Sequence, residues 1–241
     1  MIDIKINDLY PSLKPVVIKL EAEKMLTPQD ANRFCYQILR DVKTVRDAHE
    51  NELIPPFTVK KLYQNYFELH VFIPVSETAV GLHAERLGLK VKGIDYPELN
   101  IVPVHSVDGA DVVFTSPTAF RWNREYISCF EPMLFWRSAL QLWSIFTGFR
   151  IENLEEAAGR MLISMYPQFT DIRVVNYEII KNKAVCSGFV GSVQLVFARN
   201  VSAETKVFAL NLLNSASHTG VGVKRAWGMG NLEYAPAGSI V

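Results

Sequence analysis

The stretch NSASHTGVGVKRAWGMG, residues 214–230, carries the strongest local signal in the chain. A helical pattern runs into it, and a short strand pattern at 231–234 runs out of it. Glycine is costly to order, so such a density of glycines indicates a need of the backbone. Two Gly-x-Gly steps would let the main chain approach a ligand and expose N–H donors to anionic oxygens. The glycines concerned are Gly220, Gly222, Gly228 and Gly230.

The residues between the two steps favour a phosphate backbone as the ligand. Lys224 and Arg225 add two fixed charges, and Trp227 adds a flat face on which a base could stack. The spacing is not the dinucleotide fingerprint, and no Gly-Lys-Ser/Thr of a nucleoside-triphosphate loop is present. The glycines alone fit a hairpin with a chance basic pair equally well.

Working outward from this loop, the first half of the chain alternates strand and helix patterns. Residues 16–21 read as a half-buried strand, and Thr27-Pro28 opens a helix that should continue to about His49. Two strand patterns, a second helix and a last strand follow, at 57–62, 66–73, 76–87 and 90–104.

The same order returns in the second half. A strand pattern at 111–120 precedes two helical patterns, of which the second extends to Met165. Two strands at 173–180 and 188–198, a helix from Ser202 and the final strand follow. Two successive βαββαβ units predict an α+β chain of two tandem ferredoxin-like domains, residues 1–107 and 108–241. This fold hosts many functions, so the function has to be argued from residues.

Composition narrows the class of protein. The formal net charge is zero, which counts against a strongly basic nucleic-acid binder but leaves room for a local basic surface. Neither an apolar run of membrane-spanning length nor a secretory signal is visible. Cys35, Cys129 and Cys186 are widely spaced, so neither a disulfide framework nor a metal site is expected, and a reducing cytoplasm fits.

Four stretches share one resemblance. The glycine loop resembles the C-terminal loop of the CRISPR-associated endoribonucleases that process precursor guide RNA, the Cas six family of the RAMP superfamily. Residues 116–120, Ser-Pro-Thr-Ala-Phe, resemble its SPTxF strand, and Gly188-Phe-Val-Gly191 resembles its GFxG strand. His49 followed by Pro56-Phe-Thr58 is similar to the family's histidine and PFT segment. The four matches occur in the family's order across nearly the whole chain.

The resemblance implies metal-independent cleavage of CRISPR repeat RNA in the precursor transcript. The 2′-hydroxyl would attack the neighbouring phosphorus and leave a 2′,3′-cyclic phosphate and a 5′-hydroxyl, with no cofactor. Such a reaction needs proton transfer at two oxygens and donors for the phosphorane charge. Repeat RNA and other subunits of a CRISPR effector complex are the implied partners. A non-catalytic RAMP subunit that holds guide RNA is the alternative.

His49 is the candidate for proton transfer, because unperturbed imidazole changes charge near neutral pH. It also follows Val45 by four residues and could simply complete an apolar helix row. The family often adds a tyrosine and a lysine, for which Tyr36, Lys60 and Lys61 are candidates. One straight helix would hold Tyr36 about 20 Å from His49, which makes Tyr36 awkward. The two lysines could equally be solvated charges at a strand end.

Three more residues are candidates for RNA contact. His218 adjoins the glycine loop, although a histidine at a helix C-terminus also suits the helix dipole. Arg121 and Arg124 stand among aromatic residues, as RNA contacts or as an ordinary strand end. The remaining histidines receive no role: His70 and His83 read as exposed, and His105 falls between the domains.

Overall fold

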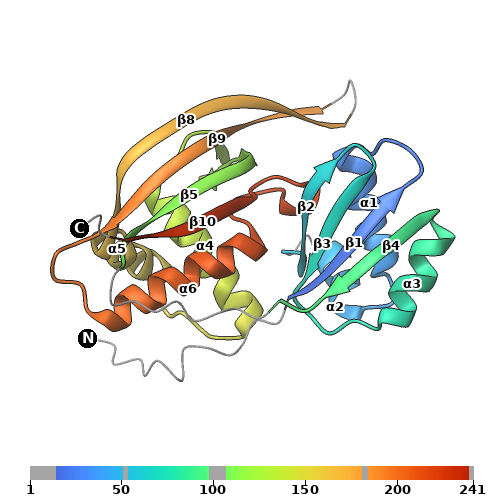
Figure 1. The fold of residues 1–241 in the computed structure, drawn as a ribbon, viewed down its shortest axis with the longest axis horizontal. Helices are drawn as coiled ribbons and strands as arrows, with labels where there is room; N and C mark the ends of the chain where they lie inside the picture. The colour runs from blue at the N-terminus through green and yellow to red at the C-terminus, as the bar shows by residue number, and fades with distance from the viewer. Residues whose placement is uncertain (1–14, 51–53, 98–106, 181–183, 239–241) are drawn as a thin grey trace.

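The computed structural model describes residues 15–50, 54–97, 107–180 and 184–238 of the 241. Its first part is a four-stranded antiparallel sheet in the order β2-β3-β1-β4, the strand order of a βαββαβ unit. Helices α1, α2 and α3 complete this part (Figure 1). The elements are β1 (Val16–Ala22), α1 (Pro28–Ile38), α2 (Lys43–Glu50), β2 (Phe57–Tyr63), β3 (Tyr66–Val71), α3 (Glu77–Arg86) and β4 (Leu89–Asp95).

The second part repeats this plan with longer elements. Its antiparallel sheet has the order β10-β5-β9-β8, which is the same order when the strands are numbered within their own unit. The elements are β5 (Val107–Thr118), β6 (Phe120–Trp122), β7 (Glu125–Ile127), α4 (Pro132–Thr147), α5 (Leu154–Ser164), β8 (Met165–Ile180), β9 (Ala184–Phe197), α6 (Ala203–Thr219), the 3₁₀ turn η2 (Arg225–Trp227) and β10 (Leu232–Gly238). The predicted double ferredoxin-like fold is confirmed.

Each sheet buries one face against its own helices. Phe57, Phe67 and Leu69 belong to the first core, while Trp136 and Phe189 belong to the second. Burial of such side chains is worth about 1.5–3 kcal/mol each, so each part has its own apolar core.

The predicted single helix from Pro28 to His49 is wrong, because two helices occupy this range. The α1 helix begins as expected, with a capping box between Thr27 and Asp30, but it ends at Ile38. The Leu39 N–H still donates to the Cys35 carbonyl, and the Val42 N–H donates to the Leu39 carbonyl, which closes a turn. The chain changes direction at 39–42, where neither glycine nor proline marks a break.

Two further differences lie in the second part. The strand expected to end at Phe120 ends at Thr118, and Phe120 begins a hairpin, β6–β7. Its two-residue turn holds Asn123 and Arg124 at φ +48° and +71°, left-handed values that asparagine tolerates well. Met165 begins β8 instead of ending a helix, so this strand starts earlier than residue 173.

Candidate active site

Tyr36 and His49 come together because of the break at 39–42. The chain changes direction between α1 and α2, and the rings of Tyr36 and His49 lie with their centroids 4.4 Å apart. Tyr36 is half-buried, with its ring edge-on to Phe57 at 5.0 Å, whereas His49 is exposed. Burial raises the pKa of the Tyr36 hydroxyl, so this group stays protonated at neutral pH. The expected separation of about 20 Å is therefore wrong, and the objection to Tyr36 as a partner of His49 disappears.

A contact with α3 stabilises the break between α1 and α2. The ring nitrogen Nε2 of His83 lies 2.6 Å from a carboxylate oxygen of Asp41, which stands inside the break. His83 is buried, which corrects its expected exposure on the helix. This contact lowers the pKa of the Asp41 carboxyl and ties the link between α1 and α2 to the next helix along the chain.

The glycine loop lies beside Tyr36. A cavity of about 320 Å³ is bounded on one side by Tyr36 and Pro55 and on the other by residues 222–227 of the loop. The Asn32 side chain on α1 donates to the Ala226 carbonyl at 3.1 Å, and Ala226 is buried in the first core. The loop therefore docks onto the helix that carries Tyr36, and residues from both ends of the chain share one cavity.

The glycines act differently from the prediction. All four N–H groups donate inside the protein, to Ala216, Ser138, Arg225 and Pro117 in order of sequence, so they do not form the expected nest of free donors. What the glycines permit is close packing at positive φ. A Cβ on Gly222 would lie 2.3 Å from the Ala119 carbonyl oxygen, and one on Gly230 would lie 2.0 Å from that of Val221.

The two basic residues of the loop, Lys224 and Arg225, lie in different environments. The Lys224 ammonium lies 5.8 Å from the Tyr126 ring and 5.9 Å from the Trp227 ring. Arg225 is 5% exposed and donates to the Thr58 hydroxyl at 3.0 Å and the Thr219 carbonyl at 2.8 Å. Burial lowers the pKa of Arg225 to about 10. Its guanidinium joins β2 to the end of α6, which does not fit the predicted phosphate contact.

The β6–β7 hairpin adds a second basic and aromatic surface next to Lys224. Arg121 and Arg124 are exposed on it, and so are Trp122 and Tyr126. Because Tyr126 lies under the Lys224 ammonium, the hairpin continues the surface that begins at the loop. We call Lys224, Trp227 and the hairpin residues 121–126 the basic–aromatic face.

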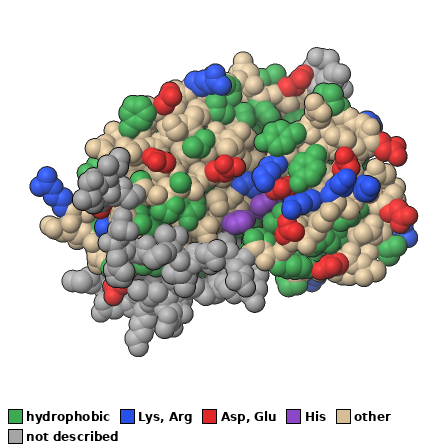
Figure 2. Space-filling model, viewed as in Figure 1, with side chains coloured by type: hydrophobic (Ala, Val, Ile, Leu, Met, Phe, Trp, Pro, Cys, Tyr) green, Lys and Arg blue, Asp and Glu red, His purple; other side chains and the backbone are tan. Residues whose placement is uncertain are grey.

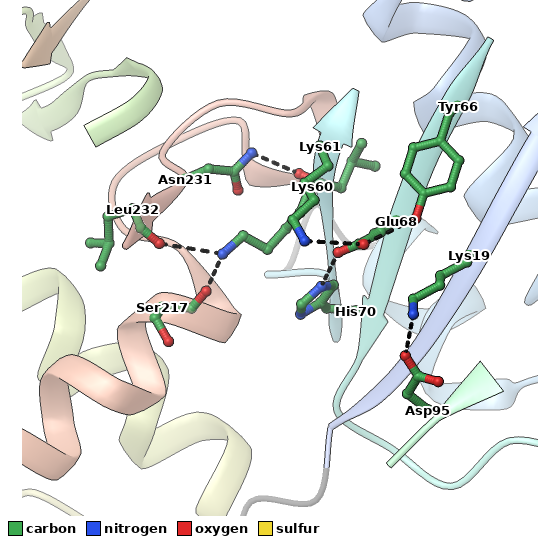
Figure 3. A network of polar contacts seen from close by, with 11 residues as sticks. Lys19, Lys60, Lys61, Tyr66, Glu68, His70, Asp95, Ser217, Asn231 and Leu232 are labelled. Atoms are coloured by element: carbon green, nitrogen blue, oxygen red, sulfur yellow. Dashed lines mark hydrogen bonds and ion pairs between the residues drawn. The ribbon is translucent and has the colours of Figure 1, made fainter. Parts of the chain in front are cut away.

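A second and larger cavity, about 580 Å³, lies elsewhere along the junction of the two parts and shares no lining residue with the first. Figure 2 shows histidine, lysine and arginine side chains gathered where the two parts of the molecule meet. Lys60 lies here, buried, with its ammonium donating to the carbonyl oxygens of Ser217 and Leu232 (Figure 3). Burial lowers the pKa of Lys60 to about 8. Lys60 is thus not a solvated strand-end charge.

Lys61 points differently from Lys60 and is half exposed. Its ammonium lies 3.3 Å from the Glu68 carboxylate, which also accepts from the Tyr66 hydroxyl at 3.0 Å and lies 3.3 Å from Nε2 of His70 (Figure 3). The hydrogen bond from His70 is the largest influence that lowers the pKa of Glu68, to about 2. Glu68 therefore stays ionised at any ordinary pH.

His70 and His218 meet across the junction, with ring centroids 5.5 Å apart. Burial lowers the pKa of both, that of His218 to about 4, so both rings are neutral at pH 7. His70 was expected to be exposed and is buried. His70 lies on the face of β3 opposite the buried Phe67, Leu69 and Val71, and that face is covered by the end of α6, about 150 residues further along the chain. No local signal could have revealed this.

The described ranges contain neither a metal-binding cluster nor a membrane-spanning helix. No group of three or more His, Cys, Asp or Glu side chains in these ranges is arranged to hold a metal ion. None of the described helices is long and apolar enough to cross a membrane. His105 lies outside the described residues.

Comparison with known protein families gives the assignment. Residues 112–232, from β5 through the glycine loop to the start of β10, match the family model described as CRISPR-associated endoribonuclease Cas6. The chain belongs to the Cas6 family. This is a family of RNA-cleaving enzymes, and the matched range includes the basic–aromatic face. No curated protein sequence matches the chain.

Solved structures of Cas6 proteins share the fold along almost the whole chain. Thermus thermophilus Cas6 (TTHB231) has a TM-score of 0.65 at 20% identity, covering 93% of this chain and 99% of that one. A product complex of Cas6 (TTHA0078) gives 0.68 at 20% identity with the same coverage. A RAMP protein solved with different RNA substrates gives 0.51 at 11% identity, covering 92% of this chain and 99% of that one. At these identities the likeness concerns the fold.

Proposed function

We propose that the chain is a metal-independent endoribonuclease that cuts CRISPR repeat RNA in the precursor transcript. The observation that carries the proposal is the contact between Tyr36 and the exposed His49, beside a cavity walled by the glycine loop. A general acid–base residue has to reach its substrate, and His49 is exposed against Tyr36, which lines a hollow that both parts of the chain form. Membership of the Cas6 family supports RNA as the substrate.

The reaction assigns a role to each group. The 2′-oxygen forms a bond to phosphorus, the bond from phosphorus to the 5′-oxygen breaks, and the proton lost from the first oxygen is balanced by one gained at the second. His49 transfers a proton, and the Tyr36 hydroxyl donates a hydrogen bond to the phosphate. Lys224 stabilises the negative charge that develops on the phosphorane. Lys60 and Lys61 do not take this role, because they line the other cavity.

The basic–aromatic face is our proposal for the path of the RNA. Arg121, Arg124 and Lys224 would contact phosphates, and Trp122, Tyr126 or Trp227 would stack on bases. Each stacked base is worth about 1–3 kcal/mol, and stacking tolerates many sequences. The exposure of Trp122 and Tyr126 supports the proposal, because an exposed aromatic surface beside cations suits a single-stranded segment.

The decisive experiment uses repeat RNA in excess EDTA. We expect cleavage to continue and to leave a 2′,3′-cyclic phosphate and a 5′-hydroxyl, both identified by mass spectrometry. A substrate with 2′-deoxyribose at the scissile nucleotide should bind and remain intact. Activity that stops on chelation and returns with magnesium would overturn the mechanism. Tight binding without any product would instead identify a non-catalytic RNA-binding subunit.

A further inference from the structure

The helix that carries His49 receives little stability from its own sequence. The α2 helix has eight residues, fewer than a helix needs to be stable by itself in water. The residue ahead of it is Val42, whose side chain cannot accept a hydrogen bond as an N-cap does. Its first residue is Lys43, which places a cation at the positive end of the helix dipole. The position of α2 therefore depends on contacts with the rest of the protein.

Apolar packing holds only one side of α2. Val45 and Ala48 are its buried residues, three positions apart on one face of the helix. Because apolar packing is not directional, two such contacts do not fix the direction in which α2 leaves α1. That direction is set in the four-residue link at 39–42, which contains neither glycine nor proline.

The contact between Asp41 and His83 supplies a directional hydrogen bond at this link. The hydrogen bond with His83 is the largest influence that lowers the pKa of Asp41, so the carboxylate is ionised at neutral pH and can only accept. The proton therefore lies on Nε2 of His83, 2.6 Å from the carboxylate oxygen. The other ring nitrogen, Nδ1, is buried and has no hydrogen-bond partner among the described residues. Asp41 thus holds the polar side of this ring.

The two partners differ in freedom of movement. The α3 helix buries Val80 and Ala84 in the first core, and Ser76 caps its start. His83 is itself only 6% exposed, whereas the Asp41 side chain is 65% exposed. The ring belongs to a packed helix and the carboxylate to an exposed link. The hydrogen bond therefore fixes the link relative to α3, and not the reverse.

The link lies between the two rings of the candidate active site. Tyr36 precedes it and His49 follows it, and their ring centroids are 4.4 Å apart. His49 stands eight residues after Asp41, which is about 12 Å along a helix. A rotation of α2 by about 10° about the link would therefore move His49 by about 2 Å. A misplacement of about 1 Å can reduce an enzymatic rate by about 10²-fold.

We infer that Asp41 and His83 are positioning residues for the reaction, because their hydrogen bond fixes the direction of α2 and keeps His49 against Tyr36. Both act through His49 and not on the substrate. Their role in cleavage rests on the proposed function, whereas their role in holding the two rings together does not. The two roles can therefore be tested separately.

NMR spectroscopy on the full chain tests the holding role in the absence of RNA. The ring protons of Tyr36 and His49 should show a nuclear Overhauser effect in the wild type, because the rings are in contact. Asp41→Ala should abolish it, whereas Asp41→Asn should retain it, since the amide oxygen can still accept from Nε2–H. His83→Phe keeps a ring in the core without the donor and should behave as Asp41→Ala does. An effect that persists in Asp41→Ala and His83→Phe would overturn the inference.

Single-turnover cleavage of repeat RNA tests the role in the reaction. Asp41→Ala and His83→Phe should each cut about tenfold or more slowly at unchanged RNA affinity, because a displaced proton-transfer group alters the rate and not the binding. The double variant should be no slower than either single variant, since both remove the same hydrogen bond. Asp41→Asn should cut at nearly the wild-type rate. An active wild type whose Asp41→Ala variant cuts at the normal rate would contradict the inference.

Glu77→Ala is the matched control. Glu77 is a carboxylate on α3, six residues before His83, and it accepts a hydrogen bond from the Tyr96 hydroxyl. Its removal should affect the stability of α3 but leave the Tyr36–His49 contact and the cleavage rate unchanged. Equal slowing by Glu77→Ala and Asp41→Ala would mean that stability alone is involved, and the inference would fail. A wild type that binds RNA without cutting it would remove the proposed function, and the NMR comparison would then decide the holding role alone.

Discussion

The same kinds of side chain lie at or beside the two cavities at the junction, but their burial differs. Beside the smaller one, His49 is exposed, with its ring against Tyr36, and Lys224 lies over aromatic rings. In the larger one, His70 is buried and Lys60 donates to two carbonyl groups. The presence of histidine, lysine and tyrosine therefore does not by itself identify an active site. The side chains with free hydrogen-bonding capacity and access to solvent are the ones available to a substrate.

Burial explains why the charged and polar side chains of the larger cavity have a structural role. Removing a lysine or a histidine from water disfavours its charged form, and the cost is reduced only by partners. Lys60 donates to carbonyl groups of the opposite part of the chain and so holds the two parts together. His70 is paired with Glu68 on its own strand, and its ring meets that of His218 across the junction. Four predictions test whether RNA is cleaved at the smaller cavity while the larger cavity joins the two parts of the chain.

The largest effect should come from His49→Ala. Single-turnover cleavage should fall by about 10²–10⁴-fold, the usual contribution of a general acid–base residue. RNA affinity and melting temperature should change little, because the ring is exposed. His70→Ala is the matched control: it should lower the melting temperature and leave the rate per folded molecule intact. If the two variants exchanged these phenotypes, the assignment of the cavities would be reversed.

Arg225→Ala should lower the free energy of unfolding by about 2–4 kcal/mol. The guanidinium makes two buried hydrogen bonds, and such bonds from a charged group are worth about 1.5–3 kcal/mol each before relaxation. Urea denaturation measures the loss, and its neighbour Lys224→Ala serves as the control with little expected change. An Arg225→Ala protein of normal stability but weak RNA binding would restore the phosphate contact expected from the sequence.

Lys224→Ala should weaken RNA binding and slow cleavage while leaving the melting temperature unchanged. If its ammonium contacts one phosphate, the slope of log affinity against log salt should decrease by about 0.7 for single-stranded RNA. Fluorescence anisotropy over a salt series gives this slope, and Lys24→Ala, on an exposed site of the first part, provides a charge-matched control. An unchanged slope would exclude Lys224 from the RNA path.

The smallest effect should appear as pH dependence. Burial lowers the pKa of His218 to about 4 in the folded protein, below its ordinary 6.5. The unfolded chain therefore binds the proton first, and stability contributed by the neutral ring is lost as pH falls from 6.5 towards 4. Between pH 7 and pH 5 we expect wild type to lose about 1 kcal/mol more than His218→Asn, a value reduced for the partial exposure of the ring. Equal losses in both proteins would contradict the prediction.

The features of the fold that depend on local sequence pattern could be predicted from the sequence. The repeated strand order, the Thr27 cap and the position of the glycine loop all follow from periodicity, turn residues and spacing. The break at 39–42 has no such signal, because a contact with His83 on another helix supports it. The burial of His70 and Arg225 depends on how the two parts meet, and a pattern within either part carries no information about that.

The docking of the glycine loop onto α1 also sets an order of events during synthesis. The first part contains Tyr36, His49 and a core of its own, and domains generally fold from the N-terminus as they emerge from the ribosome. The wall opposite Tyr36, however, consists of residues 222–227, which are made almost 190 residues later than Tyr36. A nascent chain thus brings Tyr36 and His49 together early and acquires the wall of the cavity only after residues 222–227 have been made, so a chain that lacks them cannot present the assembled cavity to RNA.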